Sequence, residues 1–135
     1  MAAAVAPPAA ISAARKWVAL VDKLMSNIER WAKEKDWLVA RLEAKTLTET
    51  VLGTYCVSDL RIRTNSGVLD VEVVARNIVG AEGRVDLVSF PTMDRFLLIR
   101  RGGRWGVKTD SGFDWPKQWG KRTFIELAQQ LTKPL

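Results

Sequence analysis

The last third of the chain combines basic and aromatic side chains in a pattern suited to binding nucleic acid. The chain has a net charge of +6, and most of the excess lies in residues 91–135. Lys and Arg neutralise phosphates, while accessible aromatic rings stack on unpaired bases. The sequence therefore predicts a non-catalytic binder of single-stranded RNA or DNA. The candidate contact residues are Arg100, Arg101, Arg104, Trp105, Lys108, Trp115, Lys117, Trp119, Lys121 and Arg122.

The same basic and aromatic residues also have a purely structural interpretation. Basic side chains on an edge hairpin prevent edge-to-edge association of sheets. Aromatic residues in a small domain usually fill its core, and the six tryptophans of this chain can serve that purpose. The nucleic-acid hypothesis therefore requires that the C-terminal cations gather into one strip beside accessible indoles.

Three acidic residues, Asp70, Glu72 and Asp86, occupy positions that neighbouring strands would bring together. Such a group could hold a hard cation for metal-dependent hydrolysis. The alternative is cross-strand ion pairing on a charged sheet surface, which the sequence favours. Its candidate partners are Arg61, Arg63, Arg76 and Arg84.

Histidine is absent, and cysteine occurs once, as Cys56. The chain therefore lacks the usual neutral-pH general base, a serine-type triad, an intramolecular disulfide and a cysteine-rich metal site. We expect neither catalysis nor a metal or cofactor. Cys56 lies in an apolar run, where a free cysteine usually behaves as a small buried hydrophobe.

Residues 11–45 are expected to form one long helix. Apolar residues recur there at steps of three and four, a period that excludes a strand, and the stripe is wide enough to lie on a globular core. A narrower heptad seam would instead indicate a coiled coil. About 35 helical residues would span roughly 50 Å, and a five-stranded sheet is only about 24 Å wide.

Two arrangements resolve this excess length. Either the helix breaks near the polar residues 33–36, or a second chain covers the overhang. The second arrangement supports an alternative function, a protein–protein interaction subunit or adaptor that forms a homo-oligomer or docks onto a larger protein. Trp37 and Leu38 are then the expected interface residues, because tryptophan is enriched at interface cores.

The middle of the chain has the alternation and turn residues of an antiparallel sheet. Leu60 and Ile62 alternate with arginines, and the Gly102–Gly103 pair suits a two-residue hairpin turn. A short C-terminal helix should follow over residues 121–131, with a capping loop over residues 112–120 before it. The expected strands span Val51–Arg63, Val68–Val79, Arg84–Met93, Arg95–Arg101 and Arg104–Thr109.

The predicted architecture is α+β, with a long N-terminal helix on an antiparallel sheet of about five strands and a short C-terminal helix. Both helices should cover the apolar face of the sheet. Residues 1–10 are expected to be a flexible Ala/Pro-rich tail, and residues 11–133 a single domain. No apolar run reaches the roughly 20 residues of a membrane helix, and no export signal is present, so we expect a cytoplasmic protein without membrane contact.

Overall fold

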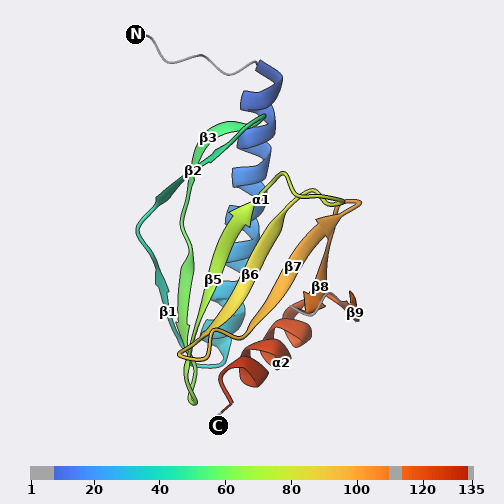
Figure 1. Cartoon of the computed structure of the whole chain (residues 1–135). Coiled ribbons are helices and arrows are strands. Elements are labelled where there is room, and N and C mark those ends of the chain that lie inside the picture. The colour runs from blue at the N-terminus through green and yellow to red at the C-terminus, as the bar shows by residue number, and fades with distance from the viewer. Residues whose placement is uncertain (1–7, 110–113, 134–135) are drawn as a thin grey trace.

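The computed structural model describes residues 8–109 and 114–133, with the backbone alone for residues 109 and 114–117. Its α+β architecture confirms the predicted class: a long helix, then antiparallel strands, then a short helix (Figure 1). The elements are α1 (Pro8–Glu34), β1 (Leu38–Arg41), β2 (Lys45–Glu49), β3 (Gly53–Val57), β4 (Leu60–Arg63), β5 (Val68–Ala75), β6 (Arg84–Phe90), β7 (Arg95–Arg101), β8 (Arg104–Thr109), β9 (Asp114–Gln118) and α2 (Lys121–Leu131).

The long helix ends much earlier than its apolar spacing predicts. At its C-terminus Asp36 adopts a left-handed backbone conformation with a φ of 60°. The Asp36 amide donates to the Lys33 carbonyl at 3.0 Å, and the Trp37 amide donates to the Ala32 carbonyl at 3.1 Å. This pair of hydrogen bonds is the Schellman arrangement that terminates helices. Of the two alternatives for the excess length, the break near residues 33–36 is therefore the one observed.

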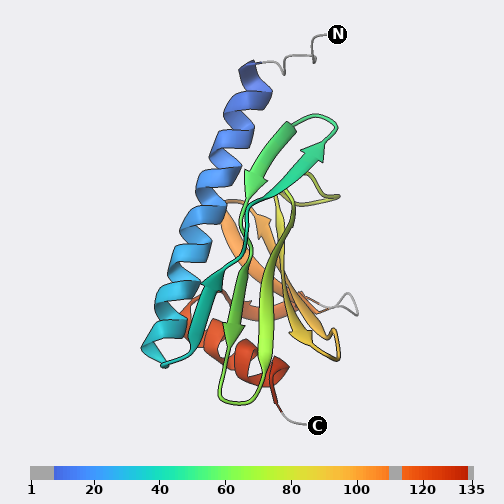
Figure 2. The ribbon, with the colours of Figure 1, turned by 90° about the vertical axis from the view of Figure 1, so that its left-hand side faces the viewer.

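The strands form two sheets in which every pair is antiparallel. The large sheet has seven strands in the order β1-β4-β5-β6-β7-β8-β9, and β2 pairs with β3 in a second sheet. The β2–β3 hairpin lies beyond the end of the large sheet, beside the N-terminal half of α1 (Figures 1 and 2). The expected strand Val51–Arg63 is divided into β3 and β4, and β1, β2 and β9 lie in segments where no strand was expected.

A single aspartate stabilises the bend between the two sheets. The chain passes from β1 to β2 and returns from β3 to β4, so these strands form one long hairpin that is kinked at residues 42–44 and 58–59. The Asp59 carboxylate accepts hydrogen bonds from the Val73 amide and from Lys45 Nζ, each at 2.9 Å. It thereby satisfies a backbone donor of β5 where the strand ladder is interrupted.

Both helices pack on the same face of the large sheet, as predicted. One continuous core joins α1, α2 and the inward-facing residues of the strands. Trp17, Met25 and Ile28 of α1 are almost completely buried, as are Phe124 and Leu127 of α2. Figure 2 shows α1 lying along one side of the sheet. We call the opposite side of the large sheet the outer face.

Several local predictions are wrong. Residues 38–41 form a strand instead of continuing the helix, and a second strand begins at Lys45, where the helix was expected to end. The helix starts at Pro8, within the segment 1–10 that was expected to be a tail, and a proline is well suited to the first helical position. Cys56 is exposed on β3 instead of buried, with its Sγ 3.5 Å from Thr46 Oγ1.

Candidate basic site on the β7–β8 hairpin

The β7–β8 hairpin positions the first group of predicted site residues. Gly102 and Gly103 form its turn with φ values of 56° and 75°, a conformation that glycine adopts without strain. Arg101 pairs with Arg104 across the turn, and Leu97 pairs with Lys108 further along. Since side chains alternate along a strand, Arg101 and Lys108 lie on the outer face.

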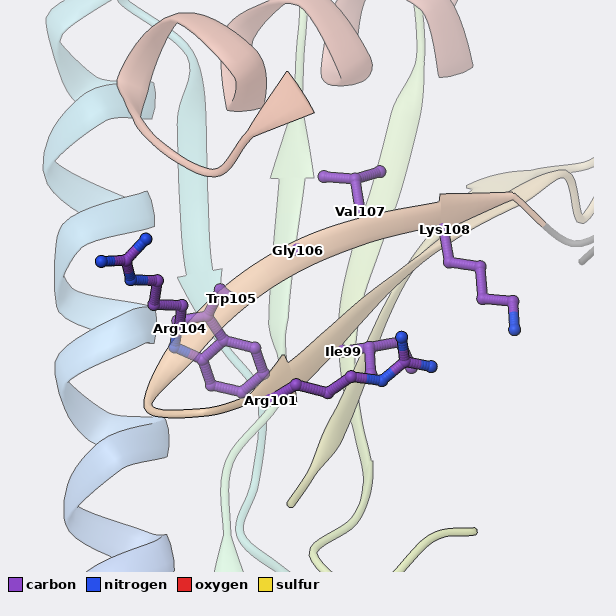
Figure 3. A pocket seen from close by; sticks show the side chains of 7 residues that line it. All are labelled: Ile99, Arg101, Arg104, Trp105, Gly106, Val107 and Lys108. Atoms are coloured by element: carbon purple, nitrogen blue, oxygen red, sulfur yellow. The ribbon is translucent and has the colours of Figure 1, made fainter. Parts of the chain in front are cut away.

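Two adjoining hollows of about 190 and 210 Å³ lie along this hairpin. They share Ile99, Arg101 and Lys108. In Figure 3 the side chains of Arg101 and Lys108 extend in the same direction beside Ile99, whereas Arg104 points the other way. The second hollow is completed by Arg84 of β6 and by the loop that carries Ile78 and Val79. We call the surface lined by Arg84, Arg101 and Lys108 the basic trough.

The acidic residues of the outer face are engaged by neighbouring arginines. The Asp70 carboxylate accepts two hydrogen bonds from Arg61, at 2.8 and 2.9 Å. The Asp86 carboxylate accepts two from Arg84 and one from Arg95, each at 2.8 Å. Two arginines, Arg84 and Arg95, thus share the Asp86 carboxylate beside the basic trough.

This pairing agrees with the ion-pairing interpretation for two of the three acidic residues. Asp70 and Asp86 are almost fully buried beneath their arginine partners, although their strand positions face outward. Within residues 8–109 and 114–133, no group of three or more acidic or cysteine side chains is arranged to hold a metal ion. Cross-strand ion pairing is therefore confirmed for Asp70 and Asp86, and Arg95 is a partner that the sequence analysis missed.

Glu72 differs from the two aspartates. It lies directly opposite Asp86 in the β5–β6 register. Partial burial of its carboxyl raises the pKa of Glu72 above its ordinary value, and the negative charge of Asp59 raises it further. Lys45 and Arg95 oppose this shift.

Strand alternation places Arg100 and Trp105 on the inner side of the hairpin. Trp105 also borders the first hollow, together with Arg101 and Lys108. The Arg100 guanidinium sits 5.5 Å from the centre of the Trp105 ring, and Trp105 packs against Trp17 of α1 with ring centres 6.1 Å apart. Trp105 joins the edge of the hydrophobic core. Its indole is therefore engaged by the protein's own side chains instead of being presented for stacking on a base.

The predicted C-terminal residues do not join the β7–β8 cations either. Trp119 packs against Trp31 and Phe124, with ring centres 5.9 and 6.0 Å apart. Lys121 forms an ion pair with Glu34 at the end of α1, and Arg122 is exposed in the first turn of α2. The side chains of the two remaining candidates, Trp115 and Lys117, lie outside the described residues.

The two predicted interface residues have different environments. Trp37 is 5% exposed and packs edge-on against Phe124 of α2, with ring centres 6.3 Å apart. It is a core residue, which corrects its assignment as an exposed contact. Leu38 is 70% exposed on β1, at the edge of the large sheet. The apolar stripe of α1 is covered by the chain's own sheet, so the premise of an exposed helical overhang does not hold.

Arg84 is the functional candidate that the sequence analysis overlooked. It was considered only as an ion-pair partner, yet it lines the basic trough together with two of the predicted residues. Side-chain alternation along β6 could have identified Arg84 from the sequence. It places Arg84 and Asp86 on the same sheet face as Arg101 and Lys108 of the next hairpin.

The chain matches no protein-family model, no curated protein and no solved structure. In the part of the chain that the structure describes, neither helix combines the length and apolar character needed to span a bilayer.

Proposed function

We propose that this chain is a non-catalytic, cytoplasmic nucleic-acid-binding protein that contacts the phosphate backbone through the basic trough. The observation that carries this proposal is the convergence of Arg84, Arg101 and Lys108 on one hollow. That hollow lies on the sheet face opposite the two helices, so it is open to a long ligand. The free, exposed thiol of Cys56 suits a reducing compartment.

The stacking mode that the sequence favours requires accessible indoles beside the cations, and that requirement is not met within the described residues, so the proposal is limited to phosphate contacts. Every indole whose side chain is described is buried or packed against the core, so base stacking on tryptophan has no support. Phosphate contacts by Arg and Lys remain, and these position a nucleic acid without reading its sequence. A site of this kind suits single strands and duplexes alike.

Salt dependence of binding is the direct test. Fluorescence anisotropy with a labelled oligonucleotide of about 20 nucleotides, single-stranded or duplex, measures affinity as salt is varied. Three phosphate contacts predict a slope of about −2 in log affinity against log salt for single strands. Raising salt from about 50 to about 200 mM should then weaken binding about 20-fold.

A pair of charge-matched variants locates the contact. Arg101→Glu with Lys108→Glu removes two of the trough's three cations and should reduce the slope to about −0.7. Arg122→Glu with Lys133→Glu changes the net charge equally at exposed positions in and after α2. This control should keep the steep slope. Affinity that does not respond to salt, or equal losses in the two variants, would overturn the proposal.

A further inference from the structure

Strand β2 presents an open edge. Among the strands that the structure describes, it pairs with β3 alone, at the end of the molecule where the two-stranded hairpin projects beyond the large sheet (Figures 1 and 2). An open edge carries backbone donors and acceptors that suit the addition of another strand. Proline, which would block such pairing, is absent from Lys45–Glu49.

The residues of this strand are complementary to themselves when read in opposite directions. The strand reads Lys-Thr-Leu-Thr-Glu. In a symmetric antiparallel pair centred on Leu47, each Leu47 lies opposite its copy, and each Thr46 lies opposite a Thr48. Each Lys45 then lies opposite a Glu49 of the other chain. Opposite charges, threonine pairs and apolar pairs are the favourable combinations across antiparallel strands.

We propose that two copies of this chain associate through antiparallel pairing of their β2 edges, centred on Leu47. The pairing would join the two β2–β3 hairpins into one four-stranded sheet with two-fold symmetry, the commonest symmetry of homodimers. It uses the β2 edge, whereas the basic trough lies on β6–β8, so the association does not depend on nucleic-acid binding.

The side-chain environments indicate what each pair contributes. Lys45 donates to Asp59 and to the Val73 carbonyl, and Glu49 accepts the backbone amides of Arg76 and Asn77. Both charges are thus held by their own chain, and across the interface they mainly set the register. Thr46 and Thr48 are exposed on the other face of the strand. Their hydroxyls form hydrogen bonds with the facing side chains of β3, so both residues can be substituted without disturbing the core.

Sedimentation equilibrium over a range of protein concentrations tests the association. The mass should rise from 15.1 kDa for one chain towards twice that value. Thr46→Lys with Thr48→Lys places lysines opposite lysines in the pair and should yield monomers. Thr46→Lys with Thr48→Glu places each lysine opposite a glutamate of the other chain and should retain the dimer. Circular dichroism and thermal unfolding establish that both variants keep the wild-type fold.

Each result has a definite meaning. A monomeric lysine pair beside a dimeric lysine–glutamate pair supports the β2 contact. A wild-type chain that stays monomeric at every concentration overturns it. A dimer that survives in both variants, or is lost in both, also overturns it, because the contact would then not depend on the charges that face each other across β2.

Discussion

Replacing Asp86 by Asn tests how the charged outer face is held together. The Asp86 side chain is fully buried and accepts three hydrogen bonds from Arg84 and Arg95, each at 2.8 Å. Removing one partner of a buried ion pair costs about 3–5 kcal/mol. The side chains of Arg84 and Arg95 are 31% and 26% exposed, so water can partly hydrate their guanidinium groups when the carboxylate is lost. We therefore expect a loss near the lower end, about 3 kcal/mol.

Asp70→Asn is the matched comparison. Asp70 is nearly as deeply buried, but its partner Arg61 is 51% exposed and regains hydration more readily when the carboxylate is lost. A smaller loss of about 1–2 kcal/mol is expected. Urea unfolding at neutral pH, followed by circular dichroism, gives both free energies, with unchanged denaturant slopes as the sign of an intact two-state transition. A loss for Asp70→Asn equal to or greater than that for Asp86→Asn would refute the reasoning.

Two further predictions concern packing and pH. A Cβ at Gly83 would meet the ring of Trp17, which is 1% exposed, so Gly83→Ala should cost about 2 kcal/mol in unfolding free energy. This loss should be smaller when Trp17 is also replaced by Phe, because the smaller ring leaves room for the methyl group. Losses that simply add in the double variant would contradict this explanation. Because the pKa of Glu72 is raised in the fold, its contribution to stability is greatest at acidic pH and is lost as pH rises through that pKa. The change in unfolding free energy caused by Glu72→Gln should therefore be more favourable at pH about 7 than at pH about 4. Urea unfolding of both proteins at the two pH values measures it, and a change that is the same at both would show that the carboxyl is not perturbed.

Strands β7 and β8 and the C-terminal helix follow closely from the sequence because their signals are local. Arg95–Arg101, Arg104–Thr109 and Lys121–Leu131 have the predicted boundaries. Alternation along β4 and β5 and the Gly102–Gly103 turn each depend on neighbouring residues only.

The error after residue 34 has a different origin. Residues 38–49 are rich in Leu, Ala, Lys and Glu, and Leu38 and Leu42 continue the helical spacing of α1. What ends the helix is a left-handed Asp36, a position where glycine is the recognisable signal. Pairing of β1 with β4 then overrides the helical propensity, and that pairing is a tertiary interaction.

The candidate site was predicted in part. Strand alternation around the Gly102–Gly103 turn already places Arg101 and Lys108 on one face, and Arg100 and Trp105 on the other. The burial of Trp119 depends on α1 and α2 meeting at the end of the core, which no local pattern encodes.

The order of the strands has a consequence for how the chain reaches its native state. From β4 to β9, each strand pairs with the next one along the chain, and the β2–β3 hairpin is nested within the pairing of β1 with β4. Each new strand pair therefore requires only a short loop closure once its neighbour has formed. Strands β4 to β9 can thus pair one after another through contacts between residues that are close in the sequence. Docking of the two helices, which lie at opposite ends of the sequence, is the step that must bridge most of the chain length.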